Sequence, residues 1–297
     1  MNAQNSYIRR KLAAALSGLA LAAAGAGVQA TEPCGEFGEC KVLIEINASD
    51  GDIGFHFLAD AENLRAVTLA EPKANGEATG KRIFQYKTRG ALRTQTVTEV
   101  FTESSEPLCY DPLFDDDDEN DDEDFVTLAQ FLDRWKFGTY TFRARSADKE
   151  KLQGHTELTN MLPAAPDEVD FDPDTGVVSW EPGDDLGACS EEEFGLEGEF
   201  EFFLDNGDIV LVEEPDMWEV VLEPDVDEDS PANGLNYSIR VPGDIDPMEV
   251  TVPADYLASL PDDTPVKVEV GGIAGEDNAT FTEEDGFCVN EVEGCED

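Results

Sequence analysis

Short alternating apolar and polar runs, separated by turn-forming residues, cover much of the chain after residue 41. The clearest runs in the first half are residues 42–46 and 53–58, joined by the loop 47–52. Alternation with a period of two places one face of a strand on a core and the other in solvent, so these runs predict half-buried strands. Further strands are predicted at residues 82–86, 96–101, 139–145 and 156–161.

One helical pattern interrupts these strands. The apolar positions 128, 131, 132 and 135 recur at the spacing of a single helix face. Thr127 and Gln130 fit a capping box at its start, and Gly138 ends it. An apolar stripe of this kind packs into a core far more often than it binds a ligand, so we expect a short core-packing helix.

The second half of the chain has the same strand-like pattern. Residues 199–204 and 209–212 flank Asn206-Gly207, a pair that tolerates the positive φ angles of a type I′ turn, so we predict a β-hairpin there. The other predicted strands are residues 177–180, 217–223, 236–241, 249–252, 266–270 and 279–282.

The segment from Met161 to Pro166 predicts a boundary between two modules, because two prolines interrupt regular pairing and basic residues nearly vanish after it. We therefore predict an all-β protein of two β-sandwich modules, residues 31–162 with one short helix and residues 163–289. An acidic tail that contains Cys295 follows at residues 290–297.

The first thirty residues have the pattern of a signal peptide. Arg9, Arg10 and Lys11 precede a short apolar run that ends at Val28-Gln29-Ala30, a small-residue cleavage site. A membrane anchor is the alternative, but this run is short and contains three glycines. We expect an exported protein, periplasmic or extracellular, without membrane insertion.

All six cysteines lie after the leader, at positions 34, 40, 109, 189, 288 and 295. An even number in an oxidising compartment predicts up to three disulfides, with fifteen possible pairings. Short loops close easily, which favours Cys34–Cys40 and Cys288–Cys295 and leaves Cys109–Cys189 to link the two halves. Zinc is disfavoured because there is no CxxC pair and there are only two histidines.

The charge is strongly negative, with 68 acidic against 19 basic residues and a net charge of −49. Removal of the leader takes it to −49 − 3 = −52. Residues 164–297 hold 41 acidic residues against two basic ones, and residues 31–163 hold 27 against 14. This excludes non-specific binding to nucleic acid or anionic lipid, which needs positive charge. Salt adaptation, multivalent-cation binding and a basic partner all remain compatible with it.

Within the first module, residues 111–124 include an almost unbroken acidic run from Asp115 to Asp124. Like charges repel, so we expect a disordered surface loop. Such a run could gather calcium loosely, without fixed geometry.

No catalytic motif is found. The chain lacks GxSxG, HExxH, a phosphate loop and a GxGxxG that opens a helix. Paired carboxylates could hydrolyse glycosides, but carboxylates are so abundant here that their presence indicates nothing. We therefore predict no enzymatic activity and no resident cofactor other than, as an alternative, calcium.

Calcium is the sharpest binding hypothesis, because hard cations take six to eight oxygens from carboxylates and carbonyls. The same residue types are favoured in ordinary turns for backbone reasons, and no candidate loop matches an EF-hand. The candidate ligand loops are Asn47/Asp50/Asp52, Asp205/Asn206/Asp208 and Asp225/Asp227/Asp229.

Residues 163–289 resemble a fibronectin type III module. Trp180, in Val-Ser-Trp-Glu-Pro, matches the core tryptophan of the second strand, and Tyr256 to Thr264 resembles the turn before the sixth strand. Val266 departs from the family, which usually has a tyrosine there. The first module resembles the N-terminal β-domain of secreted bacterial proteins that carry such a second module, through residues 47–54 and 131–140.

The resemblance implies a sandwich that presents loops and edge strands to a partner and seldom performs chemistry. We therefore expect a non-catalytic exported binding or scaffold protein for a protein or glycan partner. A calcium-dependent structural or adhesive module is the alternative, and a carboxylate-based hydrolase is the second alternative.

Overall fold

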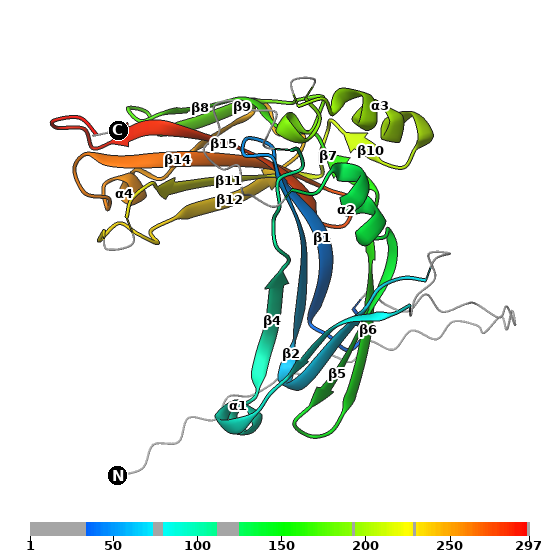
Figure 1. The fold of residues 1–297 in the computed structure, drawn as a ribbon. Coiled ribbons are helices and arrows are strands. Elements are labelled where there is room, and N and C mark those ends of the chain that lie inside the picture. Colours follow the sequence, from blue (N-terminus) through cyan, green and yellow to red (C-terminus); the bar gives the residue numbers. More distant parts are fainter. Residues whose placement is uncertain (1–33, 74–79, 112–124, 192–193, 228–229, 296–297) are drawn as a thin grey trace, which may run out of the picture. The chain divides into compact units, whose positions relative to one another are not determined.

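The computed structural model describes residues 34–73, 80–111, 125–191, 194–227 and 230–295 (Figure 1). Strands dominate it, which confirms the all-β, sandwich-like fold class. The elements along the chain are β1 (Glu39–Asn47), β2 (Asp52–Ala70), β3 (Arg82–Lys87), α1 (Gly90–Gln95), β4 (Val97–Glu103), α2 (Leu128–Arg134), β5 (Gly138–Ser146), β6 (Lys151–Leu158), β7 (Met161–Pro163), β8 (Asp167–Asp172), β9 (Val177–Glu181), the 3₁₀ helix η2 (Gly187–Cys189), α3 (Glu197–Asn206), β10 (Val210–Val212), β11 (Met217–Pro224), β12 (Tyr237–Pro242), β13 (Glu249–Thr251), α4 (Ala254–Leu257), β14 (Thr264–Ala274) and β15 (Asn278–Val289).

One ten-stranded sheet contains strands from both halves of the chain. Its order is β12-β11-β14-β15-β1-β2-β5-β6, and β3 and β4 also pair with β2. The two halves meet where β1 and β15 pair in parallel, with Glu45 opposite Ala279 and Asn47 opposite Phe281. Asn278 reinforces this junction from a fully buried position, because its amide oxygen accepts from the Ile44 N–H at 3.0 Å.

The long strand β2 pairs with different neighbours along its length. Its first part pairs with β1 and β4, and its last part pairs with β3 and β5. The register shifts where Asn63 adopts a φ of 60°, a left-handed conformation that asparagine tolerates well. The N–H groups of Cys34 and Glu36 donate to carbonyls of β6, which places the segment before β1 along the edge of the sheet that β6 forms.

Two clusters of buried hydrophobic side chains form the core. The first contains residues from Phe37 to Leu162, together with four from further along the chain, Leu186, Cys189, Phe200 and Ile209. The second extends from Val169 to Val289. The chain first reaches the second cluster just after the proposed boundary, at Val169, but it returns to the first cluster between Leu186 and Ile209. Residues from Glu32 onward form one compact unit. The division at residue 162/163 stays a prediction.

A three-stranded sheet, β13-β9-β8, covers the second cluster. Its inward residues include Val178 and Trp180, which are almost fully buried. Trp180 packs edge-on against Trp218 of β11, with ring centroids 5.8 Å apart. The second half is therefore a sandwich of this sheet and strands β12-β11-β14-β15, as its alternating pattern predicted.

The predicted helix is confirmed as α2, but it ends at Arg134, and Gly138 begins β5 instead of ending the helix. Thr127 is its N-cap, and its side chain accepts a hydrogen bond from the Gln130 N–H at 3.4 Å. Leu128 and Phe131 are buried, and Trp135 stacks on Phe55 of β2 with ring centroids 4.1 Å apart. The apolar stripe packs into the core.

The predicted hairpin at residues 199–212 is wrong. Residues 197–206 form helix α3, and only β10 follows as a strand. Gly207 caps the helix in a left-handed conformation, with φ 70° and its N–H directed to the Leu204 carbonyl. The Asn-Gly pair therefore marks a helix end, a second structure for which a positive φ at glycine is typical.

All three predicted disulfides are present: Cys34–Cys40, Cys109–Cys189 and Cys288–Cys295. Among the described residues no helix has the length and apolar character that a membrane span requires. The predicted signal peptide, residues 1–30, lies outside the described residues, as do residues 112–124 of the predicted acidic loop.

Candidate functional site

The candidate site is an acidic groove on the outward face of the ten-stranded sheet, over strands β1, β2, β11, β14 and β15. It encloses a cavity of about 470 Å³. Alternation on β1 produces this face, because Val42, Ile44 and Ile46 enter the core and the residues between them point outward. Carboxylates dominate the lining, and the one cation among the described lining residues is Lys267. The carboxylates are Glu45, Asp50, Asp52, Glu106, Glu219, Glu269 and Glu283.

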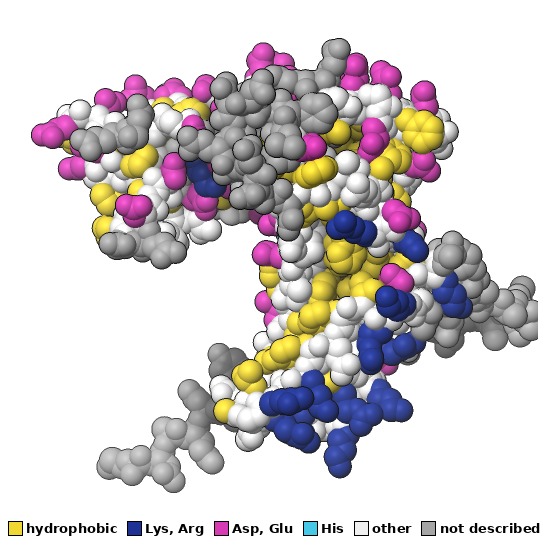
Figure 2. All heavy atoms as spheres, viewed as in Figure 1, with side chains coloured by type: hydrophobic (Ala, Val, Ile, Leu, Met, Phe, Trp, Pro, Cys, Tyr) yellow, Lys and Arg dark blue, Asp and Glu magenta, His cyan; other side chains and the backbone are white. Residues whose placement is uncertain are grey.

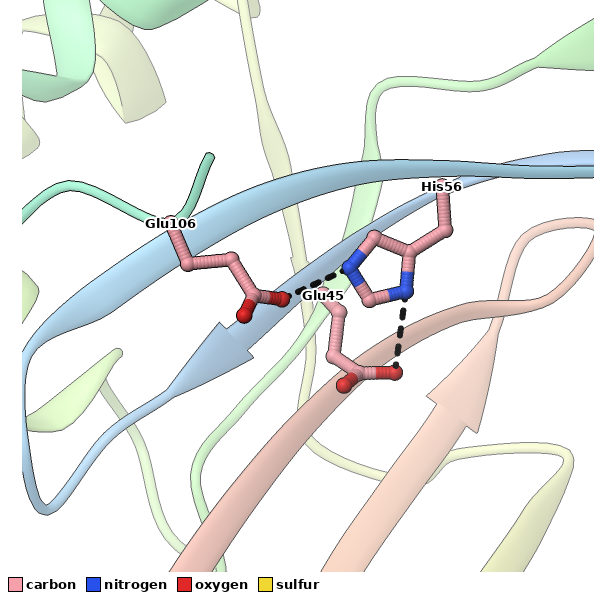
Figure 3. Close-up of side chains that lie close together, drawn as sticks. All are labelled: Glu45, His56 and Glu106. Carbon is pink, nitrogen blue, oxygen red and sulfur yellow. Dashed lines mark hydrogen bonds and ion pairs between the residues drawn. The ribbon is translucent and has the colours of Figure 1, made fainter. Parts of the chain in front are cut away.

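A histidine and two glutamates converge beside this groove, and the two glutamates belong to its lining (Figure 3). Glu106 Oε1 lies 2.7 Å from His56 Nε2, and Glu45 Oε2 lies 3.8 Å from His56 Nδ1. The three residues each offer a ligand atom, and these atoms lie within 4.8 Å of one another. His56 is only 4% exposed, so the surrounding protein fixes the position of its ring.

Strand register brings these three residues together. His56 lies on β2 opposite Leu43, two residues from Glu45 on the same face of β1. Glu106 follows β4, in a segment held along β2 by the Ser104 N–H, which donates to the Phe55 carbonyl at 3.0 Å. We call Glu45, His56 and Glu106 the His56 cluster.

Gly54 leaves the room that the His56 cluster occupies. A Cβ at this position would lie 2.7 Å from His56 Nε2 and 2.8 Å from Glu106 Oε1. Any side chain here would therefore displace the imidazole or the carboxylate. Glycine at position 54 therefore has a steric reason, the space that His56 and Glu106 occupy.

Two carboxyl groups of the groove, Asp52 and Glu45, have raised pKa values. Burial, and then the neighbouring carboxylates of Glu106 and Asp50, raise the pKa of Asp52 to about 6. Burial also raises the pKa of Glu45, although His56 acts in the opposite direction. Like charges that resist ionisation together indicate a site where a cation would relieve repulsion.

Lys267 of β14, also in the groove lining, relieves part of this repulsion between carboxylates. Its ammonium lies 2.7 Å from Glu283, 3.2 Å from Glu223 and 3.2 Å from Glu269. The pKa of Lys267 is raised, because burial is outweighed by these carboxylates. Burial nevertheless raises the pKa of Glu269, so Lys267 does not fully offset burial together with the neighbouring Glu223 and Glu283.

The predicted ligand loop Asn47/Asp50/Asp52 borders the groove, and all three residues line it. Asn47 is occupied within its own turn: its Oδ1 accepts from the N–H groups of Ser49 and Asp50, and its Nδ2 donates to Asp50 at 3.0 Å. The loop therefore acts at least as a strand-joining turn, as its residue types allowed. Calcium binding here stays a prediction.

The other predicted loops lie apart from the His56 cluster in the described structure. Asp205 and Asn206 belong to the last turn of α3, where Asn206 Nδ2 donates to the Phe202 carbonyl, and Asp208 follows the cap. Asp225 and Asp227 follow β11, and Asp229 lies outside the described residues. None of these lines the groove as described.

Sequence reasoning missed Glu45, His56 and Glu106 as a group. They are separated by up to 61 positions, from 45 to 106, and only the pairing of β1, β2 and the segment after β4 brings them together. One signal was available: a histidine on the outward face of an alternating strand, two residues after a glycine on that face. An imidazole with two carboxylates suits transition cations better than calcium, which prefers oxygen ligands alone.

Comparisons with known proteins give little. No family model matches the chain, and no curated protein matches it. Among solved structures, a chain described as "Biofilm associated protein - BSP domain" is similar at 10% sequence identity and a TM-score of 0.22. The similarity covers 90% of this chain and 32% of that one. A TM-score this low supports no inference about fold or function.

Proposed function

We propose that the protein is an exported, non-catalytic binding protein whose acidic groove takes a divalent cation at the His56 cluster. The convergence of Glu45, His56 and Glu106, within 4.8 Å of one another, carries this proposal. Three disulfides support export, because such bonds persist in oxidising compartments. A protein or glycan partner would then bind over the groove or at the sandwich loops.

The mixed donor set points to a first-row transition cation such as Zn²⁺ or Mn²⁺ in preference to Ca²⁺. A cation at the cluster would replace the hydrogen bond between His56 and Glu106. It would also offset the repulsion between carboxylates that adds to burial in raising the pKa of Asp52 and Glu45. Calcium at the Asn47 loop remains the alternative, and it would use oxygens only.

Isothermal titration of the chelator-treated protein with each of four cations, Zn²⁺, Mn²⁺, Ca²⁺ and Mg²⁺, tests the proposal. Glu106→Gln should weaken transition-cation binding by about tenfold or more. Glu106 lies in a partly exposed segment, so this change spares the core. Glu99→Gln, an exposed neighbour on β4, makes the same charge change outside the cluster and should leave affinity unchanged.

The outcomes distinguish cation binding at the His56 cluster from calcium binding at the Asn47 loop. Calcium binding that Asp52→Asn weakens and Glu106→Gln does not would favour the loop and reject the cluster. Absence of binding by all four cations would reject cation binding altogether. Equal losses in the Glu99 and Glu106 variants would reduce the effect to general surface charge.

We also propose that residues 163–289 form a fibronectin type III-like module. The three-stranded sheet β13-β9-β8 opposite β12-β11-β14-β15, with Trp180 buried between them, supports it. The family's corner tyrosine is absent at Val266, but the Tyr256 hydroxyl lies 3.0 Å from the Leu222 carbonyl oxygen and 2.8 Å from that of Leu235. This hydroxyl can hold the same region in place.

A carboxylate-based hydrolase is a second candidate, favoured by one observation. Burial and then the neighbouring carboxylates raise the pKa of Asp52 to about 6, and a carboxyl group with a raised pKa is the general acid of glycosidases. A screen of polysaccharide substrates tests it. Activity that Asp52→Asn abolishes would favour this candidate over the non-catalytic one.

A further inference from the structure

A basic face covers part of the sheet formed by β3, β2, β5 and β6. Figure 2 shows Lys and Arg side chains gathered in the lower part of the view, where Figure 1 places these strands. Strand register aligns two rows of outward positions, in which four residues are cationic and none is acidic. The rows are Lys87, Ala66, Arg145, Lys151 and Gln85, Thr68, Arg143, Gln153.

This arrangement is costly for the fold. Arg145 lies directly opposite Lys151, and like charges in opposite positions of adjacent strands are destabilising. All four cations of the face are exposed, and their side chains make no hydrogen bond or ion pair within the described part of the chain. In a chain with 68 acidic residues, eight outward positions without a carboxylate are therefore a candidate contact surface. At its edge the Glu36 carboxylate accepts from the Gln153 N–H at 2.7 Å.

An acidic face of matching construction lies on the three-stranded sheet β13-β9-β8. Register again defines eight outward positions, of which five are acidic and none is cationic. Asp167 lies opposite Glu181, another like-charged pair. The rows are Asp170, Ser179, Glu249; Asp172, Val177, Thr251; and Asp167, Glu181.

We propose that the basic face of one molecule docks on the acidic face of a second copy. Both faces lie on paired strands with small residues on a central strand, Ala66 and Thr68 on one and Val177 and Ser179 on the other, although the register of β8 and β9 shifts between Asp167 and Asp170. Each lacks the charge that the other presents, and every molecule carries both. The contact is heterologous, so it extends into open chains of molecules unless the rotation between copies closes a ring.

The contact is small. Strands lie about 4.8 Å apart, so each face spans roughly 10–15 Å across its strands, well below the size of a permanent interface. The molecules also repel one another through their net charge. The screening length is about 30 Å at 0.01 M salt, about 8 Å at 0.15 M and about 3 Å at 1 M. Association is therefore weak at low salt, strongest at intermediate salt and weak again at high salt.

Sedimentation velocity of the purified protein at about 0.01, 0.15 and 1 M NaCl measures this dependence. Arg145→Glu/Lys151→Glu removes the net positive charge of the basic face, because two glutamates then stand beside Lys87 and Arg143. Asp170→Lys/Glu249→Lys introduces cations on the acidic face. Each variant alone should remain monomeric at the salt where the wild type associates. An equimolar mixture should associate, because the unchanged acidic face of the first variant then meets the unchanged basic face of the second.

Arg134→Glu/Lys136→Glu is the matched control, since both residues are exposed near α2 and the charge change equals that of the basic-face variant. It should associate like the wild type. The proposal is overturned if the wild type is monomeric at every salt, if the reversed variants associate as well as the wild type, or if the mixture stays monomeric. Capture of dextran sulfate by the basic face without self-association would overturn it in favour of a polyanionic ligand.

Discussion

Removal of the Cys109–Cys189 disulfide should destabilise the protein more than removal of either short-range disulfide. This bond joins residues separated by 80 positions, and it fastens the segment after β4 to the 3₁₀ helix η2. The other two bonds close loops with separations of 6 and 7. A cross-link lowers the entropy of the unfolded chain more when the loop it closes is longer.

The magnitude follows from the loop lengths. The chain-entropy relation gives about 4.5 kcal/mol at 25 °C for a separation of 80, and about 2.4 kcal/mol for a separation of 7. Both sulfur atoms of the longer loop are buried, with Cys109 at 0% and Cys189 at 1% exposure, so replacement by alanine adds the cost of a small cavity. We therefore expect a difference of about 2 kcal/mol or more between the two variants.

Urea unfolding at constant 0.5 M NaCl measures the difference, because urea leaves charge screening unchanged. With a slope of about 3 kcal/mol/M, the midpoint should fall by roughly 1.5 M in Cys109→Ala/Cys189→Ala and by roughly 0.8 M in Cys288→Ala/Cys295→Ala. Fluorescence and circular dichroism should give coincident transitions. Equal losses in the two variants, or a larger loss for the short loop, would refute the reasoning.

Three further changes probe other contacts. Asn278→Ala leaves buried N–H and carbonyl partners unpaired at the junction of β1 and β15, and should lower the free energy of unfolding by about 2–4 kcal/mol in urea titrations; a loss below 1 kcal/mol would contradict it. Lys267→Met removes a cation from among three glutamates, and should cost about 1–3 kcal/mol at low salt and measurably less at 1 M NaCl; a salt-independent loss would contradict it. In the folded protein the pKa of Asp52 is raised from 3.8 to about 6, so ionisation of this carboxyl opposes folding. The Asp52→Asn variant should therefore gain stability relative to the wild type as the pH rises from about 4 to 6. A difference in the free energy of unfolding that stays constant between pH 3.5 and 7 would contradict it.

Local patterns predicted most strands because each has a buried face. The alternation that placed Val178 and Trp180 inward also placed their neighbours outward, and the structure confirms it. The helix α3 was not predicted because its sequence fits both the alternation of a strand and the spacing of a helix. Phe200 and Phe202 alternate like a strand, but Phe200 is buried whereas Phe202 is 60% exposed, as a helix with Phe200, Phe203 and Leu204 on one side requires.

The candidate site was only partly accessible from the sequence. The loop 47–52 drew attention by its residue types, and Asp52 does lie in the groove. The His56 cluster depends on which strand lies beside which, and a strand does not encode its neighbours in its own alternation. For the same reason the parallel pairing of β1 with β15, which extends the groove floor across both halves, could not be predicted.

That pairing also determines how the protein responds to force. β1 and β15 are the first and last strands of the described chain, and they run parallel where they pair. Tension that enters before β1 and leaves after β15 therefore acts along the strands and loads their hydrogen bonds together in shear, rather than opening them one after another. Asn278 lies at this place, with its amide bonded to Ile44 on one side and Met161 on the other. We expect the junction to be the mechanical clamp of the molecule, and single-molecule stretching of the Asn278→Ala variant would show a lower unfolding force if it is.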